Sequence, residues 1–242
     1  MVFCKMNYDN AGFKKVMKLF FVLTILFFAN EPVYAESDLK YDEAGFNFGS
    51  VGIDYQVQHT YFIYNTGSKS HKIDSLNVSC DCTQVTISDS VISPGDTVYF
   101  HLSFETRNYY GPTTKTFTVF TNYSGLQEYK FYYQANVGQW LNGIRPDKVS
   151  LFLLPGNIKK NISIKNRMPY EVSIINQYVS DSSFSINMLS SSASKDELIE
   201  FEVLPVKDLK AGTYRSTFTI ELKLGNKEKG ERMSFPVKIV KY

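Results

Sequence analysis

Short segments of alternating apolar and polar residues dominate the chain from Glu36 onward, and turn residues separate them about every 8–12 positions. A side-chain period of two lets a strand bury one face and expose the other. Seven such segments fill the first half, at residues 46–51, 57–64, 72–78, 84–87, 97–104, 114–120 and 128–133. Seven short strands in about 100 residues is the number found in an immunoglobulin-like β-sandwich. The sequence therefore predicts an all-β fold.

The second half of the chain repeats the first at an offset of 101 residues. Ile63-Tyr64-Asn65 corresponds to Ile164-Lys165-Asn166, Gly111 to Gly212, and Thr116-Phe117-Thr118-Val119 to Thr217-Phe218-Thr219-Ile220. Nearer the ends, Phe131-Tyr132-Tyr133 corresponds by pattern to Phe235-Pro236-Val237. Repetition at one offset predicts two tandem immunoglobulin-like domains, at residues 36–140 and 144–242. The Ser-rich stretch from Ser182 to Glu197 is predicted to be a flexible loop.

The N-terminal segment has the layout of a secretory signal peptide. An uncharged apolar run, residues 19–29, follows Lys14, Lys15 and Lys18, and Val33-Tyr34-Ala35 forms a cleavage signal. We expect residues 1–35 to be removed between Ala35 and Glu36, which leaves a periplasmic or secreted protein. A membrane anchor needs roughly 20 apolar residues. Asn30 and Glu31 cut this run short, so we do not expect the protein to span a membrane.

The charge of the chain argues against nucleic acid as a partner. The sequence has 26 Lys and Arg against 24 Asp and Glu, and residues 1–35 contain four of the basic and two of the acidic ones. Cleavage would leave 22 residues of each sign. A neutral chain without a basic stripe has little to attract phosphates.

Two turns in the first half carry recognisable chemistry. Asn65-Thr66-Gly67 supplies residues that tolerate positive φ, and Pro94-Gly95 fits the central positions of a type II turn. Two further motifs accompany them, Phe46-Asn47-Phe48-Gly49 and Ser79-Cys80-Asp81-Cys82-Thr83.

Through these four motifs the first half resembles domain-of-unknown-function family 1573. The family consists of exported bacterial proteins, frequent in Bacteroidota, and looks related to the ASH and MSP-type immunoglobulin-like domains. The resemblance covers about residues 41–137 and departs from the family pattern at Asp81, usually Gly, and at Asp96, often Glu. It implies a fold and a compartment, because the family has no agreed biochemical activity.

Cys80 and Cys82 are the one thiol pair of the mature chain, and three interpretations stay open. The pair is structural, packed as small apolar groups or joined as a disulfide, which requires a bend between positions i and i+2. Alternatively it is a redox site, although Asp81 beside both sulfurs disfavours the thiolate. In a third interpretation it binds a metal together with His59, His71 or His101, although the spacing fits no metal finger.

No catalytic template is present in the sequence: there is no Gly-x-Ser-x-Gly elbow, His-Glu-x-x-His motif or phosphate-binding loop. We therefore expect a non-catalytic protein without a cofactor or a bound metal. The leading hypothesis is a protein-interaction or structural module of the cell envelope whose partners are envelope or secreted proteins. The alternatives are a periplasmic two-domain chaperone, a thiol-redox or copper-handling protein, and a second half that serves as a type IX secretion tag.

Overall fold

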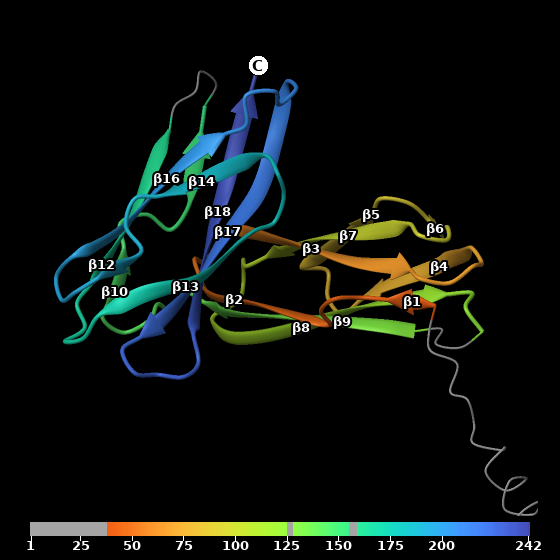
Figure 1. Cartoon of the computed structure of the whole chain (residues 1–242), viewed down its shortest axis with the longest axis horizontal. Helices are drawn as coiled ribbons and strands as arrows, with labels where there is room; N and C mark the ends of the chain where they lie inside the picture. Colours follow the sequence, from red (N-terminus) through yellow and green to blue (C-terminus); the bar gives the residue numbers. More distant parts are fainter. Residues whose placement is uncertain (1–37, 125–127, 155–158) are drawn as a thin grey trace, which may run out of the picture. The chain divides into compact units, whose positions relative to one another are not determined.

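The computed structural model describes residues 38–124, 128–154 and 159–242, and its regular elements in these ranges are all β-strands (Figure 1). The all-β prediction is confirmed. The predicted signal peptide and its cleavage site at Ala35 and Glu36 lie outside the described residues. Within the three described ranges, no helix is long and apolar enough to cross a membrane.

The described residues of the first sandwich form nine strands: β1 (Leu39–Lys40), β2 (Gly45–Val51), β3 (Gln56–Asn65), β4 (His71–Val78), β5 (Thr83–Ile87), β6 (Val91–Ile92), β7 (Thr97–Glu105), β8 (Gly111–Thr121) and β9 (Glu128–Val137). One sheet has the order β1-β3-β7-β5 and the other β2-β9-β8-β4-β6. Among its described strands, only β2 and β9 pair in parallel. All seven strands that the alternation predicts are present, and the structure adds the two-residue strands β1 and β6.

In the second sandwich, the part of the chain that the structure describes forms nine further strands: β10 (Ile144–Pro146), β11 (Leu151–Leu153), β12 (Lys160–Asn166), β13 (Val172–Val179), β14 (Phe184–Met188), β15 (Ser192–Ala193), β16 (Leu198–Pro205), β17 (Gly212–Leu224) and β18 (Glu231–Lys241). Their order is β10-β12-β16-β14 in one sheet and β15-β13-β17-β18 in the other, and β11 runs parallel to β18. This is the strand arrangement of the first sandwich, so the repeat seen in the sequence is a repeat of structure.

The prediction of a flexible loop between Ser182 and Glu197 is wrong, because this stretch contains β14 and β15. β14 pairs with β16 along its whole length and buries Phe184. Its polar residues Ser185 and Asn187 are exposed on the outer face. An alternating strand with a polar outer face has the composition of a loop, and only its pairing with β16 distinguishes the two.

Each sandwich encloses its own hydrophobic core. The first is rich in aromatic rings in contact, among them the stacked pair of Phe117 and Phe131 with centroids 4.9 Å apart. The second is more aliphatic, with Phe201, Phe218 and Phe235 at its centre. Burial alternates along β9 as the period-two pattern predicts. Two separate cores are the physical basis for two domains.

β18 of the second sandwich meets β2 of the first. Met233 pairs with Ser50, and the Ser234 hydroxyl donates to the Phe48 carbonyl at 2.6 Å. Gly49 has a φ of 65°, and a Cβ there would overlap the Arg232 carbonyl. Gly49, the glycine of the Phe-x-Phe-Gly motif, is therefore required for two reasons: its backbone conformation and the close approach of β18.

Candidate functional site

Cys80 and Cys82 lie at the corner between β4 and β5, and the structure joins them by a disulfide with a Cα–Cα distance of 5.2 Å. The chain turns here, because the Thr83 N–H donates to the Cys80 carbonyl at 3.2 Å. Cysteines two positions apart in a straight strand point the same way but are too far apart to bond. The turn, with Asp81 exposed at its tip, is what brings the sulfurs together.

Both sulfur atoms accept hydrogen bonds from neighbouring hydroxyls. Thr83 Oγ1 lies 3.1 Å from Cys80 Sγ, and the Tyr109 hydroxyl donates to Cys82 Sγ at 3.1 Å. Thr83 Oγ1 is also hydrogen-bonded to the hydroxyl of buried Tyr133. Disulfide sulfurs only accept, so Thr83 donates to Cys80 and Tyr133 donates to Thr83. Burial raises the pKa of Tyr133 to about 12, which keeps this donor protonated.

The three histidines of the metal interpretation do not meet the cysteines. Each contacts other side chains: His59 Nε2 lies 2.5 Å from Glu43 Oε1, His71 packs edge-on against Tyr123, and His101 Nδ1 lies 3.1 Å from Thr60 Oγ1. In the described part of the chain, no group of three or more His, Cys, Asp or Glu side chains is placed to hold a metal ion.

A surface depression of about 590 Å³ lies beside the disulfide, lined by the corner itself and by Glu105, Arg107, Asn108 and Tyr109. Arg107 and Asn108 are exposed, and both cysteines are partly exposed. A thiolate from outside can therefore approach the disulfide, so thiol–disulfide exchange is the chemistry open to this corner.

Asn65 holds the turn after β3 through its side chain. Its Nδ2 donates to the Lys69 and Ile92 carbonyls at 2.7 and 2.8 Å, and its Oδ1 accepts the Gly67 N–H at 2.9 Å. None of the residues Asn65 to Gly67 has a positive φ, so this turn does not use the tolerance that its residues offer. A Cβ on Gly67 would overlap the Asp38 side chain, and this contact explains the glycine.

Pro94 and Gly95 occupy the centre of the turn between β6 and β7. The Asp96 N–H donates to the Ser93 carbonyl at 3.0 Å, and Gly95 has a φ of 80°, as in a type II turn. The Gly95 N–H also donates to the Asn65 carbonyl at 2.9 Å, and the Asn65 N–H donates to the Asp96 carbonyl at 3.0 Å. The Asn65 turn and the Pro94-Gly95 turn are therefore joined by backbone hydrogen bonds into one unit.

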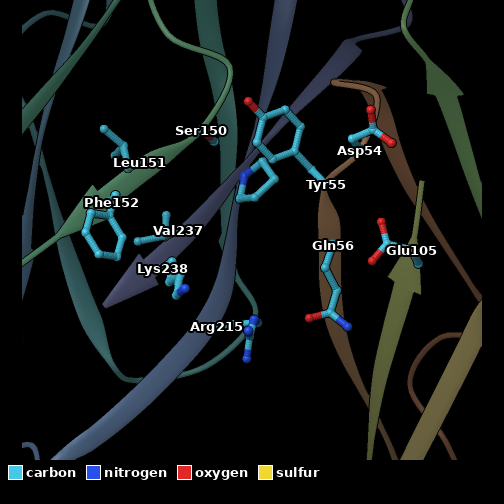
Figure 2. Close-up of a pocket in the computed structure, with 11 residues that line it drawn as sticks. Asp54, Tyr55, Gln56, Glu105, Ser150, Leu151, Phe152, Arg215, Val237 and Lys238 are labelled. Atoms are coloured by element: carbon cyan, nitrogen blue, oxygen red, sulfur yellow. The ribbon is translucent and has the colours of Figure 1, made fainter. Parts of the chain in front are cut away.

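A groove of about 560 Å³ lies between the sandwiches, and nothing in the sequence singled out its residues (Figure 2). The first sandwich supplies Asp54, Tyr55, Gln56 and Glu105, and the second supplies Ser150, Leu151, Phe152, Arg215, Pro236, Val237 and Lys238. The charges are divided between the walls, with the carboxylates on the first sandwich and the cations on the second (Figure 2). No local pattern encodes this groove, because its walls come from distant parts of the chain.

Arg215 and Lys238 stand directly opposite each other on β17 and β18. Both are exposed, and Lys238 Nζ lies 5.5 Å from the centre of the Phe152 ring. Neither cation forms a salt bridge with another described residue. Two adjacent cations repel each other, so an anionic group that binds between them is favoured.

Comparisons with known proteins give one family match. Residues 39–137 match the family described as protein of unknown function (DUF1573). No curated protein matches the chain.

Several solved structures are similar to this chain at low identity. A protein of unknown function from Porphyromonas gingivalis W83 is 11% identical, with 84% of this chain and 100% of that chain covered and a TM-score of 0.34. The YadV chaperone is 11% identical with the same coverage and a TM-score of 0.32. The VesB protease of Vibrio cholerae is 14% identical over 48% of this chain, with a TM-score of 0.34, and this chain spans only 35% of it.

The family match begins at β1 and ends at β9, and so it covers all nine strands of the first sandwich. It includes the Phe-x-Phe-Gly start, the Asn65 turn, the cysteine corner and the Pro94-Gly95 turn. The resemblance found in the sequence is confirmed. The first sandwich of this chain, residues 39–137, is a DUF1573 domain.

Proposed function

We propose that this chain is an exported, non-catalytic protein of the cell envelope that binds other envelope or secreted proteins through the edges of its sandwiches. The observation that carries the proposal is a matched pair of unprotected edge strands, β5 and β14. Each ends its sheet, and no strand among the described residues pairs with its outer side.

Neither strand has the usual features that prevent edge pairing. Their sequences, Thr83-Gln84-Val85-Thr86-Ile87 and Phe184-Ser185-Ile186-Asn187-Met188, contain no charged residue and no proline. At the opposite edges of the same sheets, β1 carries Lys40 and β10 carries Arg145 and Pro146. Charge and proline at an edge are common protection against strand addition. Protection at one edge and its absence at the other favour a binding role for β5 and β14.

The hydrogen-bond pattern identifies the backbone groups that a partner would use. The Glu105 N–H donates to the Cys82 carbonyl at 2.9 Å, and the Ser88 N–H donates to the Tyr99 carbonyl at 3.0 Å. Residues alternate in an antiparallel pair, so the N–H and C=O groups of Val85 and Ile87 point away from β7. The equivalent bonds at Ser183 and Leu189 direct those of Ile186 and Met188 outward from β14. An extended segment of another protein can pair with these groups.

Two features support export. The N-terminal residues have the order of a secretory signal, with a cleavage site between Ala35 and Glu36. The Cys80–Cys82 disulfide is the kind of bond that persists in oxidising compartments outside the cytoplasm.

Proline and alanine substitutions at the outward positions test the edge proposal. Ile87→Pro with Met188→Pro removes one outward N–H from each strand, and Ile87→Ala with Met188→Ala shortens the same side chains but keeps the N–H groups. We expect a specific partner, captured from envelope extract and measured by quantitative mass spectrometry, to be retained by the alanine variant and lost by the proline variant. Equal retention by both variants, or no specific partner under any condition, would contradict the proposal.

A second candidate function is that of a periplasmic two-domain chaperone that holds a client carboxylate between its sandwiches. The adjacent cations Arg215 and Lys238 in the groove favour it. A ten-residue alternating Val/Thr peptide with a free C-terminal carboxylate should bind more tightly than its amidated form. Arg215→Gln with Lys238→Gln should abolish that difference, and Lys223→Gln, elsewhere on β17, should preserve it. Equal binding of both peptides to the wild-type chain would remove this candidate.

A further inference from the structure

The outer face of β3, β7 and β5 carries side chains in three rows that cross the strands. Strand register places Gln58 beside Ser103 and Gln84 beyond it. The next row consists of Thr60, His101 and Thr86, and the third contains Phe62 beside Tyr99. Two rows of amide, hydroxyl and imidazole groups therefore lead into a row of aromatic rings.

The aromatic rings on this face lie next to one another; Tyr99 is exposed, and Phe62 and Tyr64 are half-buried. Phe62 lies 6.3 Å from both Tyr64 and Tyr99, and the ring of Tyr99 is nearly parallel to that of His101. Tyr99 is 45% exposed, which is high for so large an apolar surface in the middle of a sheet. The outer residues of β3 from Gln56 to Tyr64 extend over roughly 26 Å.

The polar rows form the floor of a trough of about 480 Å³. Ser180, Asp181, Thr213 and Arg215 of the second sandwich line its side. The Thr60 hydroxyl donates to the Ser180 carbonyl at 2.9 Å, so it accepts from His101 Nδ1 at 3.1 Å. His101 Nε2 is then left as an acceptor.

Ser103, at the centre of the first row, has an unused hydroxyl. Its Oγ is buried and has no hydrogen-bond partner among the described residues. A buried polar group without a hydrogen-bond partner is destabilising. A ligand that gives Ser103 Oγ this partner, after Gln58 and Gln84 rearrange around it, is therefore favoured.

We propose that this face binds an extended, neutral oligosaccharide, with the sugar hydroxyls in the trough and a sugar ring on Tyr99. A sugar hydroxyl donates one hydrogen bond and accepts others. The side-chain amides of Gln58 and Gln84 can pair with it both ways, because each has an NH2 donor and a carbonyl acceptor. The C–H face of a pyranose ring packs on an aromatic ring, and exposed Tyr99 offers one.

Other classes of ligand fit this face less well. A polypeptide strand would need outward backbone groups, and β3 and β7 are inner strands of their sheet. A nucleic acid would need a cationic stripe, and Asp181 offsets Arg215 at the trough. Apart from this opposed pair of charges, the face offers uncharged polar side chains and aromatic rings, which are the groups that recognise neutral sugars.

Titration of the full mature chain with cellohexaose, xylohexaose, mannohexaose and chitohexaose, by calorimetry and by NMR, tests the proposal. We expect at least one hexasaccharide to bind and to shift the amide signals of β3, β5 and β7. Tyr99→Ala should weaken that binding about tenfold, because it removes the stacking surface. Tyr132→Ala is the matched control: Tyr132 is 43% exposed on β9 of the other sheet, and its loss should leave affinity unchanged.

The same titration distinguishes failure of the sugar proposal from failure of the proposed binding at the strand edges. Ile87→Pro removes an N–H that only the edge proposal uses, so it should leave hexasaccharide affinity unchanged. The sugar proposal is overturned if none of the four hexasaccharides binds at millimolar concentration. It is also overturned if Tyr99→Ala, with an unchanged thermal unfolding curve, binds as the wild type does. If a peptide displaces the bound sugar and itself shifts the amide signals of β3 and β7, the sugar proposal is overturned and the face binds protein.

Discussion

Ser183 occupies in the second sandwich the position that Cys82 occupies in the first. The Glu105 N–H donates to the Cys82 carbonyl at 2.9 Å, and the Val206 N–H donates to the Ser183 carbonyl at 3.0 Å, 101 residues further along the chain. Asp181 stands where the first sandwich has Cys80, and its Oδ1 accepts the Ser183 N–H at 2.8 Å. The same corner is therefore closed by a disulfide in one sandwich and by a carboxylate in the other.

Removal of the disulfide should destabilise the first sandwich only modestly. A bond that closes so short a loop restricts the unfolded chain little, which corresponds to about 1–2 kcal/mol of unfolding free energy. Urea unfolding of Cys80→Ser with Cys82→Ser should show this loss, and dithiothreitol should produce the same loss in the wild type but none in the variant. A loss above about 4 kcal/mol would show that the corner depends on the disulfide far more than its Asp181 counterpart suggests.

Asn65→Ala and Asn166→Ala should each cost about 2–4 kcal/mol, because each removes the side-chain donor from one buried and one part-buried carbonyl. Asn166 repeats the contacts of Asn65: its Nδ2 donates to the Tyr170 and Ala193 carbonyls, both at 2.9 Å, and its Oδ1 accepts the Met168 N–H. The two losses should add in a double variant, since they act on separate cores. Asn226→Ala, at an exposed position, should change the urea midpoint very little.

Gly49→Ala should make the two sandwiches unfold in separate transitions. The new Cβ would meet the Arg232 carbonyl, and the positive φ adds a backbone cost, for a total of about 3 kcal/mol. Calorimetry should then resolve two transitions. Gly95→Ala is the control, because Gly95 also has a positive φ but no atom lies within 4 Å of the position its Cβ would take, and it should cost only about 1 kcal/mol. A single transition in Gly49→Ala would contradict this account of the junction.

Stability should fall between about pH 10 and pH 12 as the buried tyrosines ionise more readily in the unfolded chain. Burial raises the pKa of Tyr133 to about 12 from the usual 10, so its contribution is complete below pH 10 and is lost as the pH rises through 12. The loss is about 3 kcal/mol for this residue. Burial also raises the pKa of Tyr61, and its contribution changes in the same direction.

Urea unfolding at a series of pH values from 9 to about 11.5 measures this slope. Tyr133→Phe should make it shallower, and Tyr132→Phe, at an exposed position, should keep it. An unchanged slope in Tyr133→Phe would show that the Tyr133 hydroxyl is not buried as the structure has it.

Local rules acting within a few residues account for what the sequence predicted well. Alternation along β9 and β3 predicts strands because it places every second side chain in a core. The common offset of Asn65 and Asn166 predicts the duplication, and both residues make the same turn contacts. The Asn65 turn has no positive φ although its residues tolerate it, and the Asn65 side chain supplies its hydrogen bonds. The cysteine pair could be located from the sequence. Its disulfide depends on a turn at Asp81, and the sequence around Asp81 does not predict that turn.

The sequence by itself determined the strand pattern, the repeat and the family of the first sandwich. Only the tertiary structure decided that β14 is a strand, that Gly49 lies against Arg232, and that Arg215 stands beside Lys238 in a groove. The row of Gln58, Ser103 and Gln84 likewise exists only once three strands are in register. The physical reason is range: periodicity and turn chemistry act between near neighbours. The junction instead joins residues as far apart as Phe48 and Ser234, and packing of two complete cores sets their register.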